Sequence, residues 1–157
     1  MTNRTLYLCM LLVSAAAAAV IYADRAGAAA YEIPAVLEIE VVGSEYQWEV
    51  HYPGPDGKLG TDDDEIGRRD VHVPSGTRAR IHLRSRDYVY GFALPELGLK
   101  EVAIPELEFS LDVPPTQAQV TELRGNQMCG YTHPDLIGRL IVEPRDQYIA
   151  SLKRLAH

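Results

Sequence analysis

The sequence is poor in cysteine, has no excess of positive charge and lacks the common catalytic motifs. Its only cysteines are Cys9 and Cys129, and Cys9 lies in an apolar run, so a disulfide framework is excluded. The motifs CxxC and CxxCH are absent, which excludes a simple zinc ribbon, a thioredoxin site and covalent c-type haem. The absence of GxxxxGKS/T, HExxH and GxSxG removes the signatures of P-loop nucleotide binding, zinc proteases and serine hydrolases. A net charge of −7 argues against nucleic acid as the main partner.

What is present is an ordinary globular composition behind one apolar N-terminal segment. The 157 residues are 46% hydrophobic and 24% charged, which predicts one packed domain plus an appendage. Residues 6–23 carry no charge, and this length is near the lower limit for a helix that crosses a bilayer. The segment is either an uncleaved membrane anchor or a signal peptide that is cleaved within residues 26–30. Both alternatives place residues 31–157 outside the cytoplasmic membrane.

After residue 30, apolar and polar residues alternate, as is typical of half-buried β-strands. Strands are predicted over residues 36–42, 45–52, 70–74, 77–85, 87–94, 101–105, 108–113, 118–123 and 138–144. Gly, Pro and Ser separate them at roughly ten-residue spacing, which predicts an all-β sandwich or barrel. Residues 52–65 are rich in turn formers and predict a loop, and residues 145–155 predict a helix with one apolar face.

The loop between the last two predicted strands has the clearest chemical content. Cys129 and His133 are separated by three residues in the segment NQMCGYTHPDL. A tight loop can direct both side chains to one metal ion, and a thiolate with an imidazole suits copper. The alternative is a buried free cysteine and a surface histidine, and the spacing by itself does not choose between them.

Four stretches of the chain together resemble the subunit II family of cytochrome c oxidases. CGYTHPDL resembles the second half of the family's dinuclear copper (CuA) loop, CxxxCGxxHxxM. SRDYVYGFALPELGLKEVAIPE resembles SxDVxHSFxxPxLGxKxDxxPG, and YQWEVHYPGPDGKLGTDD resembles the QWxW region with its hairpin. VEPRDQYIASLKRL resembles the closing strand and helix. These stretches cover nearly all of residues 36–155 in the family order.

The resemblance implies a cupredoxin-like Greek-key β-sandwich with a short C-terminal helix. We expect residues 1–30 to be a membrane anchor, or else a signal peptide, with its linker. We expect residues 31–157 to be an exported cupredoxin domain on the periplasmic side of the cytoplasmic membrane. The resemblance implies an N-terminal transmembrane segment, which favours a single-span anchor over the signal peptide.

The resemblance also assigns copper-ligand positions, and most of them carry other residues here. Cys129 and His133 stand at the positions of the second cysteine and the second histidine. Other residues stand at the positions of the first histidine, the first cysteine, the carbonyl donor and the methionine, namely Tyr90, Gly125, Gln127 and Leu136. A dinuclear centre needs two bridging thiolates, so we expect the CuA site to be lost or altered.

A mononuclear copper site is a separate hypothesis. Cys129 and His133 supply two of the three ligands of a blue-copper site, but the phenol of Tyr90 is a poor ligand. Three further histidines fall on other predicted strands, namely His51, His72 and His82. We therefore expect no bound cofactor, with copper as the alternative. A Tyr90→His change would supply the missing imidazole, at a cost of about 1 kcal/mol if Tyr90 lies at an exposed end of the domain.

Two further features have competing interpretations. The acidic loop DGKLGTDDD, residues 56–64, is either a calcium site built from carboxylate oxygens or a solvated hairpin. Trp48 is the only tryptophan. The resemblance implies that electrons from a donor cytochrome enter near Trp48, whereas a buried position would make it part of the core.

The resemblance implies a non-catalytic subunit of a respiratory oxidoreductase complex. We expect the chain to lie beside a haem-bearing catalytic subunit of a membrane oxidase or reductase, with a cytochrome c as a further candidate partner. With its copper site lost or altered, the domain would have a structural, docking or residual electron-transfer role. The alternative is a free periplasmic cupredoxin that carries electrons on copper.

Overall fold

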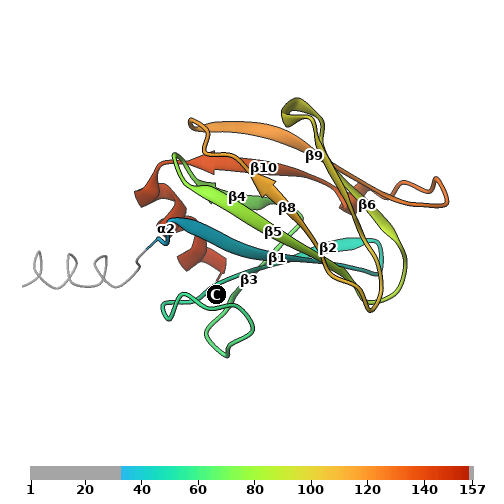
Figure 1. Cartoon of the computed structure of the whole chain (residues 1–157), viewed down its shortest axis with the longest axis horizontal. Helices are drawn as coiled ribbons and strands as arrows, with labels where there is room; N and C mark the ends of the chain where they lie inside the picture. Colours follow the sequence, from blue (N-terminus) through green and yellow to red (C-terminus); the bar gives the residue numbers. More distant parts are fainter. Residues whose placement is uncertain (1–32, 156–157) are drawn as a thin grey trace, which may run out of the picture. The chain divides into compact units, whose positions relative to one another are not determined.

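A computed structural model describes residues 33–155, and these residues form two five-stranded sheets and a C-terminal helix (Figure 1). The strands are β1 (Val36–Ser44), β2 (Gln47–Tyr52), β3 (Glu65–Arg68), β4 (Val71–Pro74), β5 (Arg78–Ser85), β6 (Tyr90–Leu94), β7 (Leu99–Ala103), β8 (Phe109–Val113), β9 (Gln119–Gln127) and β10 (Ile137–Glu143). The helix is α2 (Arg145–Leu155). Short 3-10 helices span Pro95–Leu97 and Pro134–Leu136.

The chain passes repeatedly from one sheet to the other. The first sheet has the order β3-β2-β1-β5-β8, and the second has the order β4-β10-β9-β6-β7. Most neighbours are antiparallel, but β1 pairs with β5 in parallel, as β4 does with β10. Parallel neighbours cannot be joined by a tight hairpin, so the chain passes through the other sheet between the two strands of each parallel pair. The structure confirms the predicted all-β sandwich.

The core lies between the two sheets and follows from the alternation in the sequence. In β1 the side chains of Leu37, Ile39 and Val41 are fully buried, whereas the carboxylates of Glu38 and Glu40 face outward. Burial of one such aliphatic side chain contributes roughly 1.5–3 kcal/mol. The largest fully buried side chains are aromatic, namely Trp48, Tyr52, Tyr90, Tyr148 and Phe92.

One strand was not predicted, and several predicted strands differ from the structure at their ends. The loop predicted over residues 52–65 is confirmed over residues 53–64, but β3 follows it and pairs with β2 at the edge of the first sheet. Its four residues are too few to show an alternation, so the sequence gives no strand signal there. The strand predicted over residues 118–123 continues to Gln127. The alternation in the sequence ends earlier, because the next inward position after Leu123 is Gly125, which has no apolar side chain.

The helix prediction is confirmed with the same bounds, residues 145–155. Tyr148 and Leu152 are buried, and the ring of Tyr148 lies 6.5 Å from that of Tyr52. Gly67 in β3 lets the end of the helix come close, because a Cβ there would lie 3.1 Å from Leu155 Cδ1. In Figure 1, α2 and the loop between β9 and β10 lie at opposite sides of the view.

Within residues 33–155, no helix combines the length and the apolarity needed to cross a membrane. The predicted anchor or signal segment, residues 6–23, lies outside the described residues, as does the candidate cleavage region, residues 26–30.

Candidate functional site

Four tyrosines and one histidine gather at one end of the sandwich. The ring of Tyr46 lies at their centre, and its centroid is 5.3 Å from that of Tyr88 and 5.4 Å from that of Tyr131. The rings of His133 and Tyr90 lie 5.8 Å and 6.4 Å from it. We call these five residues the aromatic cluster. They come from the β1–β2 turn, the start of β6 and the β9–β10 loop, so the fold joins three distant segments here.

The turn that presents Tyr46 has an unusual backbone. Glu45 and Tyr46 are the two central residues of the β1–β2 hairpin, and both have positive φ, 52° and 63°. Such a turn suits the twist of a hairpin but disfavours residues other than glycine, asparagine and aspartate. The second sheet holds it in place, because Asp87 Oδ2 accepts a hydrogen bond from Glu45 N (2.7 Å) and Tyr90 Oη accepts one from Tyr46 N (3.1 Å).

Tyr90 is fully buried, so the exposed position that a low-cost Tyr90→His substitution requires is not the one that the structure shows. It is the first residue of β6 and points between the sheets, where its ring lies 5.6 Å from that of Trp48. Its phenol donates a hydrogen bond to Asp87 Oδ1 (2.8 Å). Burial, and then the neighbouring carboxylate, raise the pKa of Tyr90 well above its usual range. The phenol therefore stays protonated and keeps its role as a donor.

Asp87 holds the turn and Tyr90 together. Partial burial opposes ionisation of its carboxyl group, but the hydrogen bonds from Glu45 N, Tyr90 Oη and Tyr88 N outweigh it and hold the pKa of Asp87 below its usual range. Because the pKa of Asp87 is lower in the folded protein than in the unfolded one, the ionised carboxylate stabilises the fold above pH 3.8, its ordinary pKa. This stabilisation is lost as the pH falls below that value.

An Asp87→Asn variant is therefore expected to lose less stability on acidification than the parent does. The variant cannot ionise at this position, so it is less stable than the parent above pH 3.8, and the difference shrinks below it. Urea unfolding of both proteins on either side of this pH measures the effect. A difference that stays constant with pH would show that the carboxylate of Asp87 does not stabilise the fold.

The position that the resemblance gives to the first bridging cysteine is closed. Gly125 pairs with Phe92 in the second sheet, and a Cβ at Gly125 would lie 2.6 Å from both Leu136 O and Trp48 Nε1. These two groups are hydrogen bonded, because Trp48 Nε1 donates to Leu136 O at 3.0 Å. The side chain of Leu136 is fully buried. The indole of Trp48 thus fills the space beside the backbone of Gly125.

The two retained ligand positions lie on the β9–β10 loop. Cys129 is exposed, contrary to the alternative of a buried cysteine. His133 is partly exposed, and its Nδ1 lies 3.4 Å from Asp135 N and 3.5 Å from the Asp135 carboxylate. The carbonyl of Gln127 accepts a hydrogen bond from Gly130 N (2.9 Å). Across residues 33–155, no three His, Cys, Asp or Glu side chains come together as a set that could hold a metal ion.

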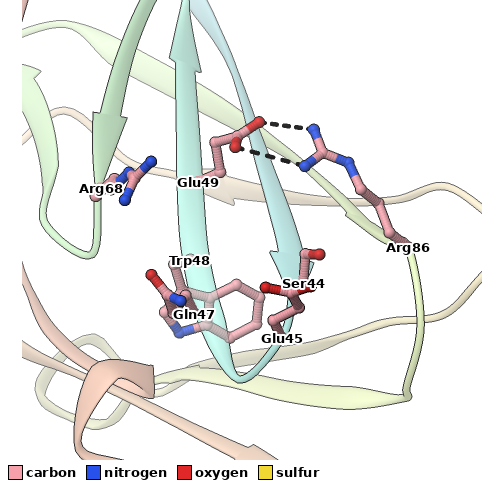
Figure 2. Close-up of a pocket in the computed structure, with 7 residues that line it drawn as sticks. All are labelled: Ser44, Glu45, Gln47, Trp48, Glu49, Arg68 and Arg86. Atoms are coloured by element: carbon pink, nitrogen blue, oxygen red, sulfur yellow. Dashed lines mark hydrogen bonds and ion pairs between the residues drawn. The ribbon is translucent and has the colours of Figure 1, made fainter.

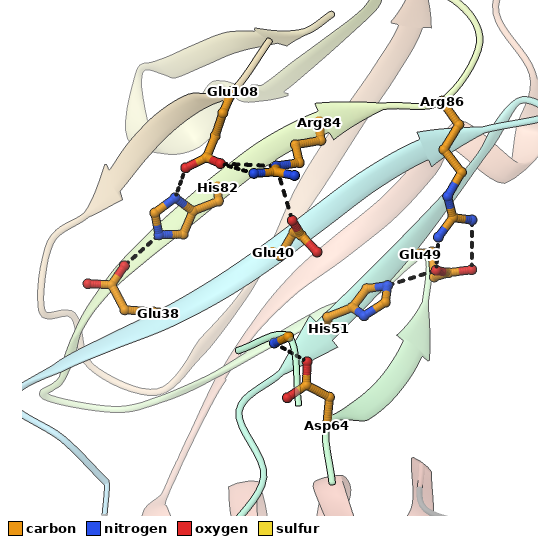
Figure 3. Close-up of polar contacts among 10 residues, drawn as sticks. Glu38, Glu40, Glu49, His51, Asp64, His82, Arg84, Arg86 and Glu108 are labelled. Carbon is orange, nitrogen blue, oxygen red and sulfur yellow. Dashed lines mark hydrogen bonds and ion pairs between the residues drawn. The ribbon is translucent and has the colours of Figure 1, made fainter. Parts of the chain in front are cut away.

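The other histidines among residues 33–155 pair with carboxylates on the outer faces of the sheets. His82 lies between Glu38 and Glu108, at 2.7 and 2.9 Å (Figure 3). His51 contacts Glu49 at 2.7 Å in the same view. His72 contacts Glu143 at 2.8 Å, where β4 meets β10. These contacts place the three histidines in surface ion-pair networks of β2, β4 and β5.

The carboxylates of the acidic loop are used within the loop. Asp64 Oδ2 accepts a hydrogen bond from Gly60 N (2.7 Å), and Asp63 Oδ1 accepts one from Thr61 Oγ1 (2.6 Å). The Thr61 hydroxyl is the main reason that the pKa of Asp63 lies below its usual range. The loop therefore has a hydrogen-bonded hairpin structure of its own.

A pocket of about 200 Å³ opens beside Trp48 at the edge of the first sheet (Figure 2). The guanidinium of Arg86 binds the carboxylate of Glu49 there at 2.7 Å, and this contact is the main reason that the pKa of Glu49 is lowered. Arg68 lines the same pocket and forms no ion pair within the described part of the chain. The indole of Trp48 is only 1% exposed, so it belongs to the core.

The aromatic cluster is the feature that sequence reasoning missed. Tyr46, Tyr88 and Tyr131 lie in three different loops, and no spacing along the chain relates them. One signal was present, because the sequence contains nine tyrosines but only two phenylalanines and one tryptophan. A preference for tyrosine over phenylalanine suits rings that keep a polar atom at a surface or a hydrogen-bond partner in the core.

Comparison with known proteins finds sequence relatives that are named cytochrome c oxidase subunit 2. No family model matches the chain. It is 28% identical over 145 residues to the alternative cytochrome c oxidase subunit 2 of Bradyrhizobium diazoefficiens, covering 78% of this chain and 52% of that protein. It is 26% identical over 117 residues to cytochrome c oxidase subunit 2 of Thermostichus vulcanus, covering 71% and 31%. The chain thus spans about half, or less, of the length of these relatives.

Solved structures show the same fold. The periplasmic domain of subunit II of cytochrome oxidase (CoxB) of Bradyrhizobium japonicum superposes with a TM-score of 0.64 at 17% identity, covering 76% of this chain and 93% of that one. The same subunit in a mixed disulfide with a thioredoxin-like protein superposes with a TM-score of 0.62 at 19% identity, covering 80% and 99%. Residues 33–155 therefore have the cupredoxin fold of the subunit II periplasmic domain, and the chain is similar in sequence to cytochrome c oxidase subunit 2 proteins.

Proposed function

We propose that the chain is a subunit II-like component of a membrane-bound haem-copper oxidase-type complex and that its cupredoxin domain works without a CuA centre. In this proposal the N-terminal segment anchors the chain in the cytoplasmic membrane and the domain lies on the periplasmic side. Its partner is a haem-bearing catalytic subunit, and its role is structural or docking. The subunit II relatives support the complex, and the residues at the ligand positions support the loss of copper.

The crowding at Gly125 is the observation that carries the proposal. A dinuclear centre needs two bridging thiolates, and Cys129 is the only cysteine among residues 33–155. A side chain at position 125 would collide with Trp48 and with the backbone of Leu136. The site therefore lacks space as well as a sulfur atom, because core groups occupy the place where the second thiolate would stand.

The remaining ligand positions do not fit a dinuclear copper group either. The hydroxyl of Tyr90 is committed to Asp87 and to the β1–β2 turn, and the aliphatic side chain of Leu136 offers no donor atom. Cys129 and His133 could offer copper one thiolate and one imidazole, which is one ligand short of a blue-copper plane. We infer that electrons reach the catalytic subunit by a route that does not use copper in this domain.

Isolation of the complex from native membranes tests this proposal. An affinity-tagged full-length chain, solubilised in mild detergent, is expected to copurify with a multi-span, haem-containing subunit. Metal analysis of the isolated chain, released from its partner and incubated with copper, is expected to show no stoichiometric copper and no thiolate–copper absorption. Recovery of the chain without partners from the periplasmic fraction, with tightly bound copper, would instead support a free copper-carrying cupredoxin.

A further inference from the structure

A continuous chain of aromatic rings runs from the core to the surface through the aromatic cluster. The ring centroid of Trp48 lies 5.6 Å from that of Tyr90, and Tyr90 lies 6.4 Å from Tyr46. Tyr46 in turn lies 5.3 Å from Tyr88 and 5.4 Å from Tyr131. The ring of Tyr88 also contacts that of Tyr90 directly, at 6.3 Å. Every step is within the range in which aromatic rings are in contact. An electron can therefore pass between surface and core by short steps through side chains that are themselves oxidisable.

The two ends of this chain of rings differ in their exposure. Tyr88 and Tyr131 are 43% and 53% exposed, so they can meet a redox reagent in solution. Tyr90 and Trp48 are buried, at 0% and 1%. A radical on Tyr88 or Tyr131 is open to coupling with a second molecule, whereas a radical on Tyr90 is shielded by both sheets.

Tyr90 also has a proton acceptor in place. Oxidation of a tyrosine releases the phenolic proton, and a buried tyrosine needs an adjacent base to receive it. Asp87 Oδ1 accepts a hydrogen bond from Tyr90 Oη at 2.8 Å. Hydrogen bonds from the backbone N of Glu45 and Tyr88 keep this carboxylate ionised and in position. No other tyrosine of the aromatic cluster has a hydrogen bond to a carboxylate among those in residues 33–155.

We propose that Tyr90 is a redox-active tyrosine that exchanges an electron with the surface through Tyr46 and Tyr88 and a proton with Asp87. A one-electron oxidant, such as a ferryl haem, takes one electron from Tyr88 or Tyr131. One electron from Tyr90 replaces it, either directly at Tyr88 or by way of Tyr46, so that Tyr90 becomes a neutral radical and Asp87 becomes protonated. A one-electron reductant returns the electron, and the proton moves back from Asp87 to Tyr90. This inference does not depend on the proposed membrane complex.

Photo-oxidation of the full-length chain tests the proposal. Flash-generated tris(bipyridine)ruthenium(III) serves as the oxidant, and rapid freezing followed by electron paramagnetic resonance identifies the radical. The parent is expected to form a long-lived tyrosyl radical. Tyr90→Phe is expected to lose this signal. The double variant Tyr46→Phe, Tyr88→Phe removes both rings that connect Tyr90 with the surface, and it is expected to confine the radical to a short-lived species on Tyr131. Asp87→Asn is expected to slow the formation of the long-lived radical. It is also expected to abolish the solvent kinetic isotope effect, which is the change in this rate when D2O replaces H2O.

Tyr148→Phe provides the matched control, because Tyr148 is another fully buried tyrosine and lies on α2, outside the chain of rings. This variant is expected to keep the parental radical. Circular dichroism of each variant verifies that the sandwich has formed before its radical yield is compared. A long-lived radical that survives in both Tyr90→Phe and Asp87→Asn would overturn the proposal, as would equal losses in Tyr90→Phe and Tyr148→Phe. If Tyr90→Phe does not fold, an unchanged rate of radical formation in Asp87→Asn and in the double variant Tyr46→Phe, Tyr88→Phe overturns it.

Discussion

A Gly125→Ala variant is expected to lower the free energy of unfolding by about 3 kcal/mol, at the upper end of the cost of overpacking a core. The added Cβ would stand 2.6 Å from Leu136 O and from Trp48 Nε1, and 2.9 Å from Trp48 Cζ2. None of these atoms can move away alone, because the indole and the carbonyl are joined by the 3.0 Å hydrogen bond. Urea unfolding followed by circular dichroism, and by the fluorescence of the single tryptophan, measures the loss.

Gly91→Ala is the matched control for this substitution. Gly91 lies on β6, the strand that pairs with β9, and a Cβ there would meet the side-chain oxygen of Asn126 at 2.4 Å. That oxygen ends a flexible, exposed side chain, which can rotate away. We expect a change of no more than about 0.5 kcal/mol, as for ordinary surface substitutions. Similar losses in both variants would mean that the strand backbone, and not the contact with Trp48, requires glycine.

The second large effect is expected at Tyr90, where Tyr90→His should lower the free energy of unfolding by about 3 kcal/mol, as do large changes at buried positions. The smaller ring leaves space beside Trp48, and Tyr46 N loses the phenol oxygen that accepts its hydrogen bond. The turn at Glu45 and Tyr46 depends on that contact, since both residues have positive φ. The expected cost is about three times the 1 kcal/mol expected for an exposed residue. Chemical denaturation at neutral pH measures it.

Tyr88→His is the control that distinguishes the effect of burial on stability from the effect of replacing a tyrosine by a histidine. Tyr88 lies two residues before Tyr90 and is 43% exposed, so we expect a loss of about 0.5 kcal/mol. Equal losses in the two variants would contradict the buried position of Tyr90. A separate prediction from the sequence concerns copper binding by Tyr90→His. Copper titration of this variant should produce a blue thiolate–copper absorption band if the new imidazole meets Cys129 and His133.

Features that depend on local order along the chain were predicted correctly. The alternation of apolar and acidic residues in β1 predicts which side chains enter the core, because successive residues of a strand face opposite sides. The spacing of apolar residues and the preceding proline predict the bounds of α2. Regular spacing of turn residues predicts a sandwich. The motifs around Cys129 and His133 predict a resemblance to subunit II, and the sequence similarity to cytochrome c oxidase subunit 2 proteins supports it.

Features that depend on contacts between distant segments were decided by the tertiary structure alone. Trp48 and Leu136 are 88 residues apart in the sequence, yet their contact explains why position 125 is a glycine. Tyr46 and Tyr90 are separated by 44 residues, and only the packing of the β1–β2 turn against β6 brings them together. The sequence by itself determines which face of each strand is apolar. The stacking of one sheet on the other decides which side chains meet, and so whether a ligand position holds a metal donor, a closed core or a redox-active ring.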